Sequence, residues 1–367
     1  MASGVDADDR GSAQANAHAN ATANANADAD SADSAANAAA AEDSSGSGGA
    51  RSQTASEAFL DEITQSVSAS IYEGRYENGR RYHTYREGAY PLPEDEREQD
   101  RLDLIQHWFG LVLKGELQRA PLDWTHDEPS DAPRRVLDVG TGTGLWALDF
   151  ADLHPDAQVI GTDLSVIQPE WTAPNCHFII DDAESDWIFT DKESFDYVHV
   201  RYLYPGIGDW ERLWQQSFEH LRPGGWAESQ EISAWFYSDE PGFEHSNIQY
   251  WQQTMDDATA RIGKRFNRAH EQKDHMIKAG FVNVVQEIIE VPMGTWDKQN
   301  LEIGKCALLN AFEGLAPTSL AIFSRVLDWD MPQIETLLAA VRNEFLYSRW
   351  KTHAKFYFTY GQKPADA

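Results

Sequence analysis

Short apolar runs, each ending at polar or acidic residues, repeat through the middle of the chain. The runs lie at 136–138 (VLD), 158–164 (QVIGTDL), 177–184 (HFIIDDAE) and 195–200 (FDYVHV). Helices are expected to begin near Leu145 and Trp210, and a further strand at Trp226 after the turn LRPGG. Apolar strands that alternate with helices predict an α/β fold with a parallel sheet.

The segments on either side of this pattern predict further helices. A helix is expected over about 94–117, with one apolar face at helical spacing formed by Leu102, Ile105, Phe109 and Val112. An amphipathic helix is also expected over about 55–68. Residues 56–132 are therefore expected to form an N-terminal helical cap, which could cover a ligand and exclude water.

The C-terminal third predicts the remaining strands. Helices are expected at about 247–262 and 267–279, and residues 281–291 (FVNVVQEIIEV) form a predicted strand. A helical pattern fills 299–347, and 354–360 (AKFYFTY) alternates like a strand. The predicted architecture is a Rossmann-like sheet of seven strands, with a C-terminal helical insertion between the last two.

Composition narrows the functional classes. Residues 1–55 consist mainly of Ala, Asn, Asp, Ser and Gly, so we expect a disordered acidic tail of low complexity. The chain carries 30 Lys and Arg against 60 Asp and Glu, a formal charge of −30. Such acidity argues against direct binding to nucleic acid. Two distant cysteines predict neither a disulfide framework nor a metal site. With no apolar signal segment and no apolar run of about 18 residues, we expect no membrane association and a location in the cytoplasm, the nucleus or both.

A glycine-rich turn follows the first predicted strand. Gly140, Gly142 and Gly144 stand between Asp138 and the helix near Leu145. Glycines there allow a tight turn and let a ligand approach the backbone at a helix N-terminus. The dinucleotide fingerprint is G-x-G-x-x-G, whereas this turn has G-x-G-x-G after an acidic residue. The spacing resembles that of S-adenosylmethionine-dependent methyltransferases and disfavours a nicotinamide-dependent oxidoreductase. Asp138 is then expected near the cofactor's ammonium group.

Acidic residues at the next strand ends fit the same cofactor. Asp163 ends the second predicted strand, where a carboxylate can accept bonds from ribose hydroxyls. Asp182 is expected at the adenine amino group, with the backbone of Ala183 beside the ring. Arg201, at the fourth strand's end, is a further predicted cofactor-pocket residue.

The aromatic and basic stretch 71–90 adds two predicted cofactor contacts. Tyr82 could face the sulfonium cation, and Arg81 could bind the cofactor's carboxylate. A base is needed only if the acceptor must lose a proton. The candidates are His83, His199, Tyr204 and Glu228, none of them in a diagnostic constellation. His199 is more naturally a core histidine, and Glu228 could point outward from its strand.

Longer segments resemble the fungal LaeA-like methyltransferases. The most specific are those containing YHTYREG, IQP and VPMGTW, with the wider matches NGRRYHTYREGAYPLPEDEREQDRLDL (78–104), RVLDVGTGTGLWALDFAD (135–152) and WERLWQQSFEHLRPGGWAESQEI (210–232). The resemblance extends over nearly everything after residue 70. It implies a class I methyltransferase domain over 133–367, with the helical insertion at about 299–347 and S-adenosyl-L-methionine as cofactor.

The resemblance implies two functions. One is methylation of a small-molecule acceptor in fungal secondary metabolism. The alternative is a nuclear regulator of secondary-metabolite genes that works through velvet-type protein partners. The segment DDAESDW (181–187) departs from the sequence expected in the namesake regulator, which favours the first function.

Overall fold

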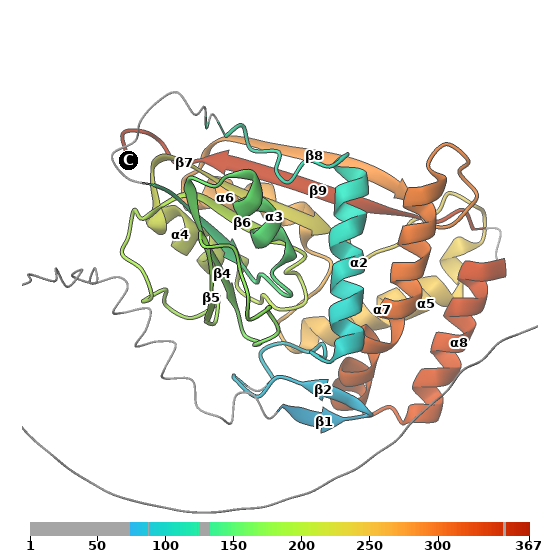
Figure 1. Cartoon of the computed structure of the whole chain (residues 1–367). Helices are drawn as coiled ribbons and strands as arrows, with labels where there is room; N and C mark the ends of the chain where they lie inside the picture. The colour runs from blue at the N-terminus through green and yellow to red at the C-terminus, as the bar shows by residue number, and fades with distance from the viewer. Residues whose placement is uncertain (1–73, 87, 123, 125–132, 348–349) are drawn as a thin grey trace, which may run out of the picture. The chain divides into compact units, whose positions relative to one another are not determined.

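The fold is a seven-stranded sheet flanked by helices, seen in a computed structural model (Figure 1). The structure describes residues 74–86, 88–122, 124, 133–347 and 350–367. The expected tail at 1–55 and the expected helix at 55–68 lie outside the described residues.

The sheet has the order β5-β4-β3-β6-β7-β9-β8. Its strands are β3 (Arg134–Val139), β4 (Ala157–Asp163), β5 (Cys176–Ile180), β6 (Phe195–Arg201), β7 (Leu221–Ile232), β8 (Val282–Pro292) and β9 (His353–Gln362). The first five pair in parallel, whereas β9 is antiparallel to both of its neighbours. The predicted α/β class and the seven strands are confirmed. The strand β7 begins at Leu221, ahead of the expected start at Trp226, and includes the PGG segment.

Helices connect the strands and cover the sheet. They are α3 (Leu145–Leu153), α4 (Trp210–His220), α5 (Asn247–Arg261), α6 (Gln272–Ala279), α7 (Leu301–Leu327) and α8 (Met331–Tyr347), with short 3-10 turns η2 (Phe243–His245) and η3 (Ala269–Glu271). The predicted insertion is confirmed as α7 and α8. The helix α7 ends at Leu327 and α8 begins at Met331, and Asp328 between them has a φ of 54°. By length and composition alone α7 could cross a membrane, but more than half of its apolar window is buried in the protein, as in any core helix.

The segment before the sheet is only partly helical. Strands β1 (Arg75–Glu77) and β2 (Arg80–Tyr82) form a hairpin across Asn78-Gly79, both at positive φ, where a helical cap was expected. Asn-Gly is a strong signal for such a two-residue turn. The helix α2 (Glu96–Val112) follows, capped by the Asp95 side chain, which accepts from the Glu98 N–H. It ends before the expected Leu117, because Lys114 and Gly115 adopt positive φ.

The core places α2 between the sheet and the helical insertion (Figure 1). Trp108 and Phe109 of α2 contact Phe356 of β9 edge-on, at centroid distances of 4.7 and 5.0 Å. Ala307 of α7 belongs to the same apolar cluster. This packing sets α2 beside the carboxyl ends of the parallel strands, where ligand sites of open α/β sheets lie.

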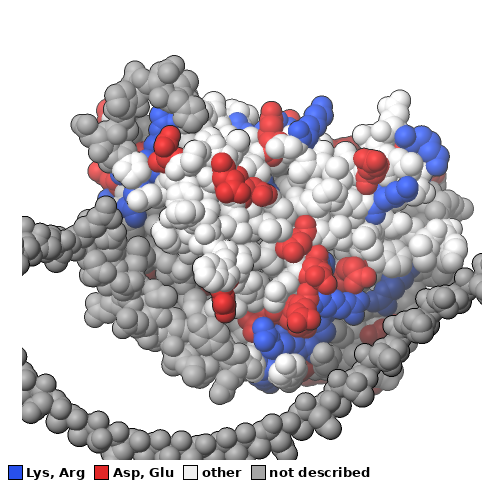
Figure 2. All heavy atoms as spheres, in the orientation of Figure 1, with Lys and Arg blue, Asp and Glu red and all other residues white. Residues whose placement is uncertain are grey.

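The surface carries charges of both signs. On the face drawn in Figure 2, acidic side chains lie next to basic ones, so their charges partly offset each other. An ion pair joins the hairpin to the insertion, where the Arg325 guanidinium meets the Glu77 carboxylate at 2.6 Å.

Candidate active site

A cavity opens at the carboxyl ends of β3, β4, β5 and β6. It contains about 1140 Å³ of space, part of it open to solvent. The predicted site residues that line it are Asp138, Gly140, Gly142, Asp163, Asp182, Ala183 and Arg201. Seven residues predicted from separate parts of the sequence therefore meet at one cavity.

The glycine turn is held tightly between neighbouring side chains. Gly140 has a φ of 69°, and a Cβ placed there would lie 2.3 Å from Leu203 Cδ1. Gly144, the N-cap of α3, has a φ of 82°, and its Cβ would lie 2.5 Å from the Phe178 ring. Any side chain at either position would strain the backbone and collide. Gly144 does not line the cavity, and the Phe178 ring packs against it, so its contact with the cofactor stays a prediction.

Asp138 and His199 form a buried pair below the turn. Asp138 Oδ1 lies 2.8 Å from His199 Nδ1, and Asp138 Oδ2 accepts from the Thr141 hydroxyl at 2.6 Å. The imidazole stacks on Trp146 with a centroid distance of 3.6 Å. Burial lowers the pKa of His199, so the ring is neutral at pH 7. His199 does not line the cavity, and its surroundings are those of a core histidine that orients Asp138.

Asp163 reaches the cavity from the end of β4. Its Oδ1 accepts from the Ser165 N–H at 2.9 Å and its Oδ2 from the Gly142 N–H at 2.8 Å. Burial raises the pKa of this carboxyl to about 6, although the two backbone bonds oppose the shift. Each carboxylate oxygen keeps a lone pair for a ligand hydroxyl.

Two acidic residues, Asp181 and Asp182, follow β5. Asp182 is the predicted adenine contact, whereas Asp181 was not among the predicted site residues. Asp182 accepts from the Glu184 N–H at 3.0 Å and from the Ser185 hydroxyl at 2.9 Å, and Arg86 lies 3.6 Å away. Asp181 also lines the cavity, and burial raises its pKa to about 6. The sequence alone does not show which of two adjacent carboxyl side chains faces the cavity, because the orientation of each depends on the conformation of the turn.

Arg201 lines the cavity but binds mainly to the protein. Its guanidinium donates to Gln230 Oε1 at 2.9 and 2.6 Å, to Gln106 Oε1 and to the Leu117 carbonyl. It also lies 4.7 Å from the centroid of the Phe109 ring. Burial lowers the pKa of Arg201 to about 10, which leaves the group charged at neutral pH. Arg201 therefore fixes α2 against the sheet at the cavity wall.

Arg81 and Tyr82 do not reach this cavity, contrary to the sequence prediction. Arg81 Nε lies 3.3 Å from Glu94 Oε1. Tyr82 is buried against α7 with the Arg325 guanidinium 5.0 Å from its ring centroid, and burial raises its pKa to about 12. The residues of this region that do line the cavity are Ala89, Tyr90, Pro93 and Glu94. The interleaved Tyr and Arg pattern did not show which side chains faced inward.

Two other candidate bases, His83 and Glu228, form hydrogen bonds within the protein framework. His83 Nδ1 lies 2.6 Å from the Tyr85 carbonyl and Nε2 lies 3.3 Å from the Tyr90 carbonyl, so the ring braces that loop. Glu228 is fully buried, not outward-facing, and accepts from the N–H groups of Arg119 and Ala120 and from the Tyr197 hydroxyl. Neither residue lines the cavity. Among the described residues, no group of three His, Cys, Asp or Glu side chains could hold a metal ion.

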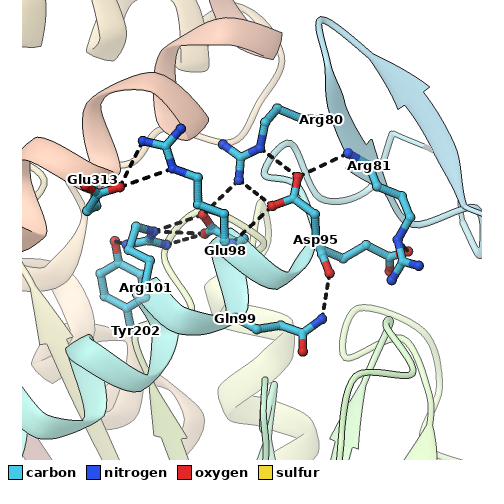
Figure 3. A network of polar contacts seen from close by, with 10 residues as sticks. Arg80, Arg81, Asp95, Glu98, Gln99, Arg101, Tyr202 and Glu313 are labelled. Carbon is cyan, nitrogen blue, oxygen red and sulfur yellow. Dashed lines mark hydrogen bonds and ion pairs between the residues drawn. The ribbon is translucent and has the colours of Figure 1, made fainter. Parts of the chain in front are cut away.

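A chain of ion pairs connects the hairpin to the site (Figure 3). Arg80 binds Asp95 through two hydrogen bonds of 2.6 and 2.7 Å, and its Nη2 lies 3.9 Å from Glu98 Oε2. Glu98 accepts from Arg101 Nε at 3.0 Å, and Arg101 Nη1 donates to the Tyr202 hydroxyl at 3.2 Å. Tyr202 lines the cavity described above, so the network ties α2 and the hairpin to the cavity wall.

A second cavity adjoins the first. It contains about 660 Å³ of space, part of it open to solvent, and shares Ile105 and Tyr202 with the first cavity. Tyr204, a predicted candidate base, lies on its wall with its hydroxyl 3.3 Å from that of Tyr202. Burial raises the pKa of Tyr204 well above its ordinary value, so the phenol keeps its proton at neutral pH.

The strand order, the glycine turn and the acidic strand ends together define a class I S-adenosylmethionine-dependent methyltransferase. A family model described as a methyltransferase domain matches residues 112–286. The methyltransferase pytC of Aspergillus terreus is 37% identical over 310 residues, which cover 83% of this chain and 92% of that protein. The secondary metabolism regulator LAE1 of Cochliobolus heterostrophus is 36% identical over 73% of this chain and 88% of that protein. The regulator laeA of Aspergillus flavus is 33% identical over 79% of this chain and 78% of that protein. The chain belongs to the LaeA-like methyltransferase family.

The first cavity fits S-adenosylmethionine in its chemistry. A Cβ at Gly142 would make an ordinary van der Waals contact with Leu102 Cδ1 at 3.7 Å, and Gly142 lines the cavity. Asp163 has acceptor capacity for ribose hydroxyls, and Asp182 has it for the adenine amino group. The wall also carries apolar side chains, among them Leu164 and Ile207. The assignment of individual residues to parts of the cofactor stays a prediction.

Replacing Asp163 with alanine tests the predicted ribose contact. We expect the affinity for S-adenosylmethionine to fall by about 1–3 kcal/mol, roughly 5- to 150-fold, because ribose hydroxyls lose a buried acceptor. Titration calorimetry gives the affinity, and a melting curve shows that the variant is folded. Asp191→Ala, a substitution at an exposed position, is the matched control and is expected to keep the wild-type affinity for S-adenosylmethionine. Wild-type affinity in Asp163→Ala would rule out the ribose assignment.

Proposed function

We propose that this methyltransferase acts on a small molecule that binds in the second cavity. The observation that carries the proposal is that the two cavities share Ile105 and Tyr202. A ligand in the second cavity would thus lie next to the cofactor site, against α2. A concave, mostly apolar cavity of this kind suits a small molecule better than a folded protein surface.

The chain's own residues would bind, orient and shield the reactants. When bound, S-adenosylmethionine would supply an electrophilic methyl group, and the electron pair of the broken carbon–sulfur bond would stay on sulfur as the bond to the acceptor forms. Asp163, Asp182 and the glycine turn would fix the cofactor, and the Asp138–His199 pair would hold the turn in place. Leu102 and Ile105 of α2 would exclude water from the methyl group. Alignment of the two reactants is the main contribution expected from the protein.

The alternative is regulation through velvet-type partners, which the relatives named as secondary metabolism regulators motivate. The two functions differ in what becomes methylated. A small-molecule enzyme transfers the methyl group to an acceptor that an organic solvent extracts.

We also propose an intracellular location, in the cytoplasm or the nucleus, supported by the free thiols of Cys176 and Cys306.

Transfer of a radiolabelled methyl group separates these functions. The protein is incubated with methyl-labelled S-adenosylmethionine and either the small-molecule fraction or the protein fraction of one fungal culture. We expect label in the organic extract of the first incubation, and about 5- to 150-fold less with Asp163→Ala at a cofactor concentration below both dissociation constants. Label found only in precipitated protein would contradict the proposal.

A further inference from the structure

The mostly apolar wall of the second cavity includes two residues with an N–H donor that has no hydrogen-bond partner in the described part of the chain. Trp108 Nε1 and Asn310 Nδ2 both belong to residues that line it, and both nitrogens are buried without a hydrogen-bond partner among the described residues. The side chains are 4% and 5% exposed. Buried N–H donors are nearly always paired, since an unpaired one is costly. The two donors belong to residues of one cavity wall, where a ligand that accepts hydrogen bonds would satisfy them.

The rest of the wall is largely apolar and comes from distant segments. The helix α5 contributes Trp251 and Met255, the segment after β8 contributes Met293, and Phe236 follows β7. Asn310 belongs to α7 of the helical insertion, and Trp108 belongs to α2. A ligand that fills this space must present mostly apolar surface to it.

The charges at the cavity are already balanced. Among the described residues of the wall, Arg101 is the one that is charged at neutral pH, and Glu98 binds its guanidinium. Behind them Arg80 binds Asp95, so two cations and two anions form one neutral network (Figure 3). An ionic ligand would have no counter-charge left to meet. The wall therefore favours an uncharged ligand.

We infer that the second cavity binds an uncharged, mostly apolar acceptor that carries a carbonyl or ether oxygen, held by the N–H groups of Asn310 and Trp108. This deepens the proposed function and rests on it. Such an oxygen can accept from both donors without bringing a charge into the cavity. The acceptor would meet the cofactor past Ile105 and Tyr202, the residues common to both cavities.

Methionine methyl groups provide a direct readout of binding. The chain has 5 methionines. Met255 and Met293 line the second cavity, whereas Met276 is buried outside this wall and Met331 is 38% exposed. Full-length protein labelled with 13C at the methionine methyls is titrated with 2-acetonaphthone, an uncharged aromatic ketone. The signals of Met255 and Met293 are expected to shift while those of Met276 and Met331 stay in place. Shifts confined to Met276 or Met331, or no shifts, would overturn the inference.

A matched pair of probes tests the two donors. The second probe, 2-isopropenylnaphthalene, has the same shape but a CH₂ group in place of the oxygen. The ratio of the ketone's affinity to the hydrocarbon's is expected to fall about fivefold in Asn310→Leu, which preserves side-chain shape and removes the donor. Leu309→Ala, an exposed position on the same helix, should keep the wild-type ratio. Trp108→Phe provides a second variant should Asn310→Leu fail to fold. An unchanged ratio in a folded variant of each donor would overturn the inference.

The two proposals fail in different ways. Calorimetry with S-adenosylmethionine on the same samples reports the cofactor site alone. Loss of cofactor binding with retained shifts at Met255 and Met293 would refute the proposed function and leave a ligand cavity. Normal cofactor binding without those shifts would refute the inference alone.

Discussion

Replacing Glu228 with alanine is expected to lower the free energy of unfolding by about 3–5 kcal/mol, because buried donors would lose a charged acceptor. The Arg119 N–H donates to both carboxylate oxygens at 2.9 Å, the Ala120 N–H donates at 2.7 Å, and the Tyr197 hydroxyl at 2.9 Å. Gln230 Nε2 adds a further bond of 2.6 Å. Denaturant titration of wild type and variant measures the difference.

This result would assign Glu228 to the framework and not to the chemistry. The carboxylate fixes the chain between α2 and β3 onto the sheet, far along the sequence from its own strand. Glu228→Gln keeps the shape and one acceptor oxygen, so its loss should be smaller, about 1–2 kcal/mol. A Glu228→Ala variant with wild-type stability and no methyl transfer would instead support the base role considered from the sequence.

Glu231→Gln is expected to change how stability depends on pH. Glu231 is fully buried at the end of β7, and its Oε1 accepts from the Leu203 N–H at 2.9 Å. Its Oε2 is buried with no hydrogen-bond partner among the described residues. Burial raises the pKa of this carboxyl to about 8, against an ordinary value of 4.5, although the Leu203 and Tyr204 N–H groups oppose the shift.

The direction of the effect follows from proton binding. Between pH 4.5 and pH 8 the folded state holds a proton that the unfolded state has released. The stability that Glu231 contributes is therefore complete below pH 4.5 and lost as the pH rises to about 8. The amide in Glu231→Gln does not titrate. The unfolding free energy of the variant should therefore rise relative to that of wild type by about 1.4 kcal/mol for each pH unit across this window. Unfolding free energies of both proteins at pH 5, 6, 7 and 8 test this, and parallel curves would contradict it.

Much of the fold was predictable because its signals are local. Apolar runs that end at Asp138 and Asp163 mark buried parallel strands, and the glycine turn between Gly140 and Gly144 requires backbone conformations that other residues avoid. The hairpin β1–β2 was also encoded locally, in Asn78-Gly79, although a helical cap was predicted for this region.

The surroundings of polar side chains were less predictable because their partners are distant in sequence. Glu228 meets Arg119, and His199 stacks on Trp146, so the partners of these side chains could not be predicted from the strands alone. Arg81 and Tyr82 were misplaced for the same reason, since the hairpin turns Tyr82 toward Arg325. The second cavity combines seven separate segments, and only the folded chain brings Trp108 and Asn310 to one wall.

Calorimetric titration of the purified protein with S-adenosylmethionine, with NAD as the control, tests the central claim most directly. The geometry of the glycine turn, Asp163 and Asp182 predicts one site per chain with a dissociation constant on the order of micromolar, and no heat from NAD. Heat from NAD at the same site, or none from S-adenosylmethionine, would contradict a working methyltransferase site.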